Sequence, residues 1–225
     1  MRVKLAALAL AWLGIAFSVN SHKHSNNHVK NHVKVKTPNG DCPDGPTKVT
    51  NLPFWNTSDT LPCMYSGFIK SSPTLNHNLF YWLFKNQEID NPSLVLWLNG
   101  GPGSSSMFGL FTENGPIRVA RNGTSVNDFT VGLSKEGSWM DEADVIFLDQ
   151  PVQVGFSYGD GYATTMQQIS DEMVNFLVSF IYVEYPEYKG RDLIITGESY
   201  AGKYLPQLAT SIHKYNIKQA TQPSP

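Results

Sequence analysis

The chain has few cysteines and little net charge, and both limits narrow the classes of protein to which it can belong. Its 225 residues include two cysteines and carry a formal net charge of −2. A balance so close to neutral gives no reason to expect nucleic acid as a partner. The two cysteines, Cys42 and Cys63, can pair with each other in an oxidising compartment, pair elsewhere or stay free. With 41% hydrophobic and 12% aromatic residues, the composition is that of one globular domain with a substantial core.

Apolar runs long enough to span a bilayer comfortably are also missing. The N-terminal run, LAALALAWLGIAF, has thirteen residues and follows the basic start MRVK, and the small residues Ala16 and Ser18 near its end could serve a signal peptidase. This pattern predicts a cleaved secretory signal peptide over residues 1–18 rather than a membrane anchor, so we expect no membrane attachment after cleavage. The glycosylation acceptors Asn56 and Asn122 agree with a secretory route.

Acidic residues are absent from residues 19–40, which are rich in His, Asn and Lys. This composition is typical of a solvated linker, and weak metal binding is the alternative. Four of the six histidines of the chain lie here: His22, His24, His28 and His32. The globular domain is expected over residues 41–225.

Several apolar segments of that domain predict strands. YSGFIK and NLFYWLFK, separated by the polar turn SSPTLNHN, indicate two neighbouring strands. SLVLWLNG, ADVIFLD and DLIIT are nearly continuous apolar runs, typical of strands buried on both faces of a parallel sheet. Between the last two, core-type residues recur at helical spacing: Met166, Ile169, Met173, Phe176, Leu177 and Phe180. The order strand, helix, strand predicts a right-handed crossover and an α/β architecture.

Ser199 lies where the last of these strands should give way to a helix, in the sequence GESYAG. Gly197 provides room for a tight turn, and Ala201 stands where the pattern G-x-S-x-G has its second glycine. Such an elbow lifts the serine hydroxyl above the sheet edge and directs the amide of Tyr200 toward a developing oxyanion. A serine in an ordinary turn is the alternative, but the flanking strand and helix favour a nucleophile.

A second glycine-rich segment, WLNGGPGSSSMFGLFTENGP, follows another buried strand. Gly100 and Gly101 allow the backbone to approach a ligand closely. An α/β-hydrolase takes its second oxyanion donor from the loop after its third strand, which this segment fits. A phosphate-binding loop is disfavoured because the lysine and the third glycine of that motif are missing. We expect neither a metal nor a cofactor.

The segments WLNGGPGSSSMFGLFTENGP, ADVIFLDQPVQVGFSYGDG and ITGESYAGKYLP, in this order, closely resemble the serine carboxypeptidase family. The likeness spans roughly residues 52–206. It implies an α/β-hydrolase fold, with a mostly parallel sheet and antiparallel first strands. It also implies removal of C-terminal residues from peptides through an acyl-enzyme at acidic pH. The expected location is the lysosome or vacuole, or outside the cell.

The resemblance also implies roles for individual residues. Ser199 matches the nucleophile, and the amides of Gly101 and Tyr200 match the oxyanion hole. A further group matches the residues that recognise the free carboxylate of the substrate: Trp97, Asn99, Gly100, Glu113 and Glu198. Two neighbouring carboxyls cannot both ionise cheaply, so one keeps a proton and can donate it to the substrate carboxylate. Without the resemblance, Glu113 would be interpreted as a surface carboxylate on a helix.

Two positions depart from the usual pattern of the family. Ser104 replaces a cysteine that forms a disulfide with a later segment, so that one covalent link is lost. Gln153 replaces a common glycine, which puts the local loop geometry in question.

The acid and the histidine that should follow the nucleophile are also missing. In α/β-hydrolases the chain order is serine, then acid, then histidine. The 26 residues after Ser199 contain no Asp or Glu, and a helix would carry His213 well away from the hydroxyl. We therefore expect an α/β-hydrolase fold truncated after the elbow, with an incomplete triad and little activity of its own. The alternatives are an acyltransferase on the same fold and a non-catalytic secreted binding protein.

Overall fold

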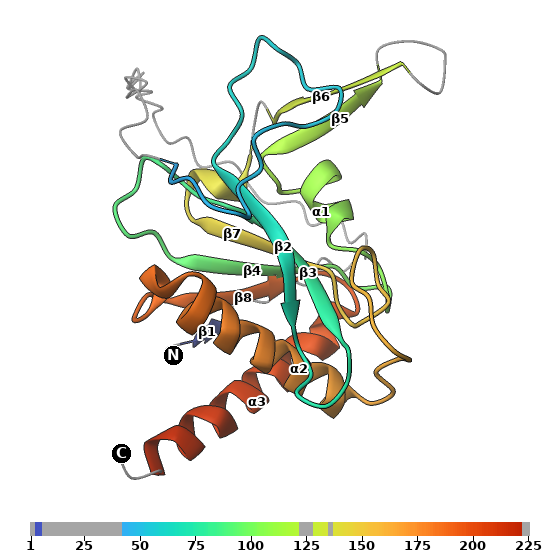
Figure 1. Cartoon of the computed structure of the whole chain (residues 1–225), viewed down its shortest axis with the longest axis vertical. Coiled ribbons are helices and arrows are strands. Elements are labelled where there is room, and N and C mark those ends of the chain that lie inside the picture. Colours follow the sequence, from blue (N-terminus) through green and yellow to red (C-terminus); the bar gives the residue numbers. More distant parts are fainter. Residues whose placement is uncertain (1–2, 6–41, 122–127, 135–136, 222–225) are drawn as a thin grey trace, which may run out of the picture.

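A computed structural model of the chain describes residues 3–5, 42–121, 128–134 and 137–221, which build one mixed β-sheet with helices and a separate hairpin (Figure 1). The predicted linker and Asn122 lie outside the described residues, as does the predicted signal peptide apart from residues 3–5. Among the described residues, no helix combines the length and the apolar character needed to cross a membrane.

The six strands of the main sheet follow the order β1-β8-β4-β7-β3-β2. Strands β1, β8, β4 and β7 run parallel to one another, whereas β3 is antiparallel to both β7 and β2. The bounds are Val3–Leu5 (β1), Met64–Lys70 (β2), Asn78–Phe84 (β3), Leu94–Leu98 (β4), Asp144–Leu148 (β7) and Leu193–Gly197 (β8). The predicted mostly parallel sheet with antiparallel first strands is therefore confirmed. Because β1 falls within the predicted signal peptide, cleavage there would expose the edge of β8.

The central strands are buried on both faces because their sequences are continuously apolar. All five residues of β4 and all five of β7 are buried. On one face, Leu96 and Ile146 belong to a core cluster that includes residues of α2 and α3. On the other face, Trp97 and Phe147 pack with residues of α1 (Met107–Thr112). Alternation along the strand thus places Trp97 on the side of the sheet that carries α1.

The predicted crossover helix is present as α2, Met166–Ser179. It begins at Thr165, whose side chain accepts a hydrogen bond from the Gln168 amide at 3.1 Å, and it continues into the π-helix η2, Phe180–Glu184. Helix α3, Ala201–Thr221, starts directly after β8 and packs beside α2 (Figure 1). The two long helices therefore cover one face of the sheet together.

A two-stranded hairpin on the α1 side was not predicted from the sequence. It consists of β5, Ile117–Arg121, and β6, Phe129–Leu133, paired antiparallel. Figure 1 shows that it projects away from α2 and α3. The hairpin directly follows α1, so it fixes the path of the chain after that helix.

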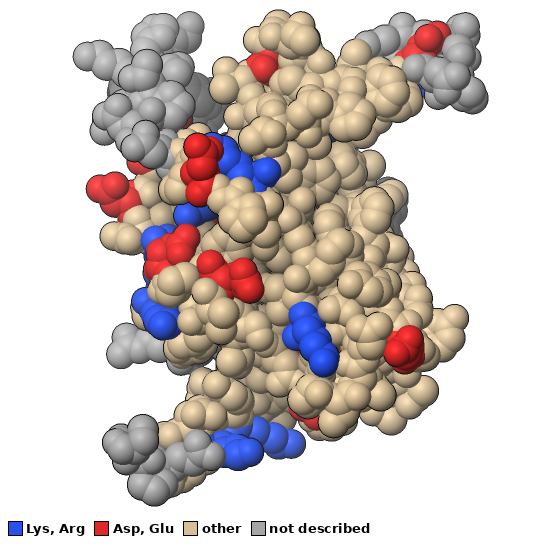
Figure 2. All heavy atoms as spheres, in the orientation of Figure 1, with Lys and Arg blue, Asp and Glu red and all other residues tan. Residues whose placement is uncertain are grey.

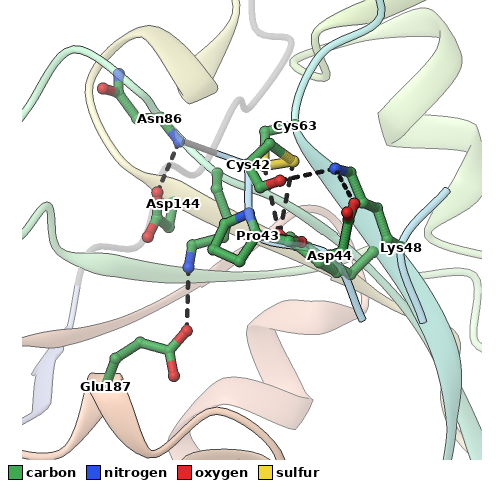
Figure 3. Close-up of a disulfide and its surroundings, with 10 residues drawn as sticks. Cys42, Pro43, Asp44, Lys48, Cys63, Asn86, Asp144 and Glu187 are labelled. Carbon is green, nitrogen blue, oxygen red and sulfur yellow. Dashed lines mark hydrogen bonds and ion pairs between the residues drawn. A yellow bond between two sulfur atoms is a disulfide. The ribbon is translucent and has the colours of Figure 1, made fainter. Parts of the chain in front are cut away.

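Cys42 and Cys63 form a disulfide that ties the start of the described globular part to the residue before β2 (Figure 3). Their Cα atoms lie 5.5 Å apart. The Lys48 amine donates to the Cys42 carbonyl at 2.7 Å and to Asp44 Oδ1 at 2.8 Å beside it. Closing a loop of this length stabilises the fold by roughly 3 kcal/mol in the chain-entropy account.

Charged side chains on the viewed face gather along one side, where acidic and basic groups lie close together (Figure 2). Two ion pairs among the described residues are Lys48 with Asp44 and Lys85 with Glu187, and the Nζ and Oε1 atoms of the second pair are 3.0 Å apart. Water and salt screen the attraction in such partly exposed pairs, so they contribute little to stability.

Candidate active site

Ser199 occupies a strained turn between β8 and α3. Its φ angle is 55°, a value that L-residues rarely adopt, and its side chain is exposed. The turn is closed by the Ala201 amide, which donates to the Glu198 carbonyl at 2.9 Å, and by the Gly202 amide, which donates to the Ser199 carbonyl at 2.9 Å. A positive φ at a serine costs of order 1 kcal/mol or more and persists only where the surroundings enforce it. This is the geometry expected of a nucleophile elbow.

Gly197 permits this turn because no side chain fits at its position. A Cβ atom there would lie 2.4 Å from the Leu98 carbonyl oxygen and 2.7 Å from the Ala201 Cβ. Ala201 is itself fully buried. The methyl group that replaces the second glycine of the pattern is therefore accommodated, provided that position 197 remains glycine.

The loop after β4 lies against the elbow. A Cβ atom on Gly100 would be 2.5 Å from the Tyr200 amide nitrogen and 2.8 Å from the Glu198 carbonyl oxygen. The next residue, Gly101, has φ of 102°, which favours glycine. The structure thus brings together the two segments that carry the predicted oxyanion donors, Gly101 and Tyr200.

Asp149, to which the sequence analysis gave no role, holds the loop after β4 in place through hydrogen bonds. Its Oδ1 atom accepts hydrogen bonds from the Ser105 hydroxyl at 2.6 Å and the Ser106 amide at 2.9 Å, and its Oδ2 atom accepts from the Phe156 amide at 2.9 Å. Burial raises the pKa of Asp149, and these donors oppose the rise. The signal in the sequence is an acidic residue directly after the buried strand β7.

Three of the residues predicted to bind a substrate carboxylate, Trp97, Asn99 and Glu198, form a hydrogen-bonded chain. The Trp97 indole donates to Asn99 Oδ1 at 2.8 Å, and Asn99 Nδ2 donates to Glu198 Oε1 at 2.9 Å. The Gly109 amide also donates to Asn99 Oδ1, at 3.1 Å. Because Oδ1 accepts two donors, the amide group is oriented with its NH₂ toward Glu198. The sequence analysis gave Gly109 no role. A Cβ atom at this position would lie 2.3 Å from the Trp97 indole nitrogen, so only glycine fits there.

Glu113 reaches the same group of residues from the end of α1. It is the C-cap residue of that helix, and its amide donates to the Gly109 carbonyl at 3.0 Å. Burial raises the pKa of Glu113, and so do the charge of Glu198 and a hydrogen bond with that residue, whereas the charge of Arg118 acts in the opposite direction. Ionisation of Glu113 beside Glu198 is therefore disfavoured.

The two departures from the family pattern lie in ordered turns. Gln153 has φ of 72°, its amide donates to the Ser157 carbonyl at 3.1 Å, and its side chain donates to the Gly159 carbonyl at 2.5 Å. Ser104 is exposed, and its amide donates to the Gly100 carbonyl at 3.1 Å. The loop thus retains a left-handed residue at position 153 even without glycine.

Neither histidine in the described part of the chain is placed to activate Ser199. Both ring nitrogens of His77 are engaged, with Glu172 Oε1 and with the Asp160 carbonyl, each at 2.8 Å. His213 lies on α3, about 21 Å along the helix from Ser199 at 1.5 Å per residue. Of the predicted glycosylation acceptors, Asn56 is exposed.

Known proteins are similar to this chain in sequence. The family model described as Serine carboxypeptidase matches residues 56–224. The probable serine carboxypeptidase CPVL of Mus musculus is 40% identical over 183 residues, which cover 79% of this chain and 36% of that protein. The pheromone-processing carboxypeptidase KEX1 of Clavispora lusitaniae is 36% identical over 231 residues, which cover 100% of this chain and 33% of that protein.

A solved structure is similar as well. It is the crystal structure of Kex1(Δ)p, a prohormone-processing carboxypeptidase from Saccharomyces cerevisiae, with a TM-score of 0.62 and 32% identity. The match covers 70% of this chain and 35% of that one. The predicted α/β-hydrolase fold class is thereby confirmed. The chain spans about a third of the length of the relatives it matches.

Proposed function

The chain belongs to the serine carboxypeptidase family, and from this premise we propose that it carries the nucleophile and the substrate-recognition residues of a carboxypeptidase that acts on peptides with a free C-terminus. The observation that carries the proposal is the hydrogen-bonded chain from Trp97 through Asn99 to Glu198. This chain ends on the residue directly before Ser199, so recognition of the carboxylate and attack on the carbonyl occur side by side.

In this proposal, Ser199 Oγ attacks the carbonyl carbon of the last peptide bond. The new C–O bond gives a tetrahedral intermediate whose oxyanion accepts hydrogen bonds from the amides of Gly101 and Tyr200. The C–N bond then breaks, and the released amino acid takes up the proton that Ser199 has lost. Water hydrolyses the resulting acyl-enzyme in the second half of the reaction.

The proposed pH dependence follows from the carboxyl pair. Glu113 and Glu198 can donate a hydrogen bond to a substrate carboxylate only while they hold a proton. Burial and the neighbouring Glu198 raise the pKa of Glu113, so the proton is retained under mildly acidic conditions. As the pH rises through the pKa of Glu113, a second negative charge forms beside Glu198 and repels the substrate carboxylate. This supports activity at acidic pH, in keeping with a lysosomal, vacuolar or extracellular location.

The described residues supply no general base beside Ser199, because His77 is bound to Glu172 and His213 is distant. The proton transfers therefore need groups outside the described part of the chain. We expect the 225-residue chain alone to hydrolyse a blocked dipeptide far more slowly than a full-length relative assayed between pH 4 and 7. Equal rates would contradict this assignment and would require a base that the described site does not contain.

Substrate recognition can be tested without turnover. We expect the whole chain at pH 5 to bind an N-blocked dipeptide acid at least about tenfold more tightly than the corresponding amide, which corresponds to about 1.4 kcal/mol. Calorimetry measures both affinities. Glu198→Ala should remove the difference, whereas Glu88→Gln, a change at an exposed glutamate outside the site, should leave it intact. Equal affinity for acid and amide would contradict the carboxypeptidase proposal and would favour an acyltransferase or a binding protein.

A further inference from the structure

We propose that Arg118 is a positioning residue for this site: its guanidinium holds the backbone that carries Glu113, and its charge sets the upper pH limit for recognition of a C-terminal carboxylate. The inference deepens the proposed function and rests on it. Arg118 lies on β5, outside the motif residues assigned from the sequence.

The guanidinium of Arg118 donates hydrogen bonds to four backbone carbonyls. Its Nη1 atom donates to the carbonyls of Leu110 at 3.3 Å, Gly115 at 2.8 Å and Ile117 at 3.0 Å. Its Nη2 atom donates to the carbonyl of Glu113 itself. These carbonyls come from the last turn of α1, from the turn that follows it and, for Ile117, from the first residue of β5. Arg118 therefore binds the backbone on both sides of Glu113.

The chain needs such a group at this point because α1 ends abruptly. The helix has only six residues, and the carbonyls of a last helical turn have no partner within the helix. The turn that follows is tight, since a Cβ on Gly115 would lie 2.1 Å from the Leu110 carbonyl oxygen. Converging carbonyl dipoles attract a cation, and the planar fork of arginine can bind several of them at once. The ammonium group of lysine cannot reproduce that geometry.

The same charge acts on the carboxyl pair. The charged groups that face Glu113 are Glu198, from the elbow between β8 and α3, and Arg118, from β5. Glu198 raises the pKa of Glu113, and Arg118 lowers it. Removing the positive charge should therefore keep the shared proton in place to a higher pH. Arg118 thus contributes in two ways: its hydrogen bonds position the backbone of Glu113, and its charge lowers the Glu113 pKa. Two substitutions can distinguish these contributions.

Arg118→Lys keeps the positive charge but loses the planar guanidinium that binds several carbonyls, whereas Arg118→Met loses both the charge and the guanidinium. The affinities of the blocked dipeptide acid and its amide, measured by calorimetry from pH 4 to 8 on the whole chain, report the two contributions. We expect Arg118→Lys to weaken binding of the acid about tenfold with an unchanged pH limit and unchanged binding of the amide. For Arg118→Met we expect the same loss, together with an upward shift of the pH limit.

Arg121→Met is the matched control, because it removes a charge of the same sign from the exposed end of the same strand. It should change neither affinity nor pH limit. Arg118→Lys also controls for folding, since it should retain the cooperative thermal transition. If the unmutated chain prefers the acid and both Arg118 variants retain its affinity and pH limit, the inference is wrong and the proposed function stands.

A second measurement is independent of substrate. In the whole chain with ¹³C-labelled glutamate, NMR follows the titration of the Glu113 carboxyl directly. Arg118→Met should raise the pKa of Glu113, and Arg121→Met should not. If the unmutated chain shows no preference for the acid, the proposed function fails. The titration then decides separately whether Arg118 controls the carboxyl pair, and an unchanged titration in Arg118→Met overturns the inference.

Discussion

Gly100 and Tyr200, far apart in the chain, lie so close that a Cβ atom on Gly100 would be 2.5 Å from the Tyr200 amide nitrogen. The contact joins the loop after β4 to the elbow after β8. Both segments carry backbone amides assigned to the oxyanion hole, so their separation has to be fixed closely. A backbone contact without side chains provides that fixed distance.

Gly100→Ala should therefore disturb both stability and binding. The new methyl group meets the backbone of Glu198 and Tyr200, which cannot move aside as a flexible side chain could. We expect a loss of about 2 kcal/mol from overpacking. This corresponds to a fall in Tm of roughly 4–8 °C for a chain of this length.

Thermal unfolding followed by circular dichroism checks this expectation, together with the affinity for a peptide acid. Gly45→Ala is the control, since no atom lies within 4 Å of the added methyl and its φ is not in the left-handed range. An unchanged Tm for Gly100→Ala would mean that the loop and the elbow are not in contact as described.

Ser199→Gly should stabilise the protein, although it removes the nucleophile. Ser199 has φ of 55°, which glycine adopts without strain. Relief of the strain should raise the free energy of unfolding by about 1 kcal/mol. Ser199→Ala also removes the hydroxyl but retains the Cβ, so it should bring no such gain. Comparing the melting temperatures of these two variants tests whether the elbow is strained, and equal values would argue against it.

His77 and Glu172 form a buried pair that should make the stability depend on pH. The His77 side chain is fully buried, and acceptors face both of its ring nitrogens at 2.8 Å, an arrangement that suits the protonated ring. Burial lowers the pKa of His77, but the hydrogen bonds with Asp160 and Glu172 outweigh it, so the pKa is raised. The stabilisation is therefore complete below the unfolded-state pKa of about 6.5 and is lost as the pH rises through the folded-state value.

Replacing one partner of this pair should cost most stability at acidic pH. His77→Gln should lower the free energy of unfolding by about 3 kcal/mol at pH 5 and by less at pH 8.5. Chemical denaturation at both pH values measures the difference. His213→Gln, at an exposed position on α3, serves as the control and should show no comparable dependence. A loss of equal size at both pH values would mean that the ring is neutral in the folded protein.

The main sheet could be predicted from the sequence because each central strand is marked by the residues of the strand itself. The central strands β4, β7 and β8 read as apolar runs closed by Gly or Asp, and burial on both faces demands that composition. The hairpin of β5 and β6 was missed for the opposite reason. Its sequences, IRVAR and FTVGL, are short and mixed, and most of their residues are not buried.

Some residues of the candidate site could likewise be predicted from the sequence, and others could not. Ser199, Asn99 and Glu198 lie in recognisable motifs, and the structure brings them together. Asp149 and Arg118 act mainly through contacts with backbone groups. The sequence marks Asp149 only by its place directly after a buried strand, and it gives no sign that the Arg118 guanidinium turns back onto the end of α1. From the sequence alone, Gly109 is only an unfavourable residue within a helix. The structure gives the reason for it, because a side chain at this position would collide with Trp97 and Asn99.

Glu113→Gln and Glu198→Gln should extend substrate recognition to higher pH, because an amide can donate a hydrogen bond at any pH. The pKa of Glu113 is raised in the folded protein by burial and by Glu198, so its favourable contribution is present at low pH and is lost as the pH rises through the folded-state pKa. Glu113→Gln should therefore stabilise the chain relative to the unmutated form at pH 7.5 and much less at pH 4.

Both effects can be measured on one set of samples. Calorimetry with the blocked dipeptide acid gives the pH at which affinity falls, which should move upward in each variant. Thermal unfolding at pH 4 and 7.5 gives the change in stability. Glu88→Gln removes a similar charge at an exposed position and should change neither. If Glu113→Gln left the pH limit of binding unchanged and gave the same stability difference at both pH values, no proton would be shared between the two carboxyls. The acidic pH optimum proposed for this site would then need another cause.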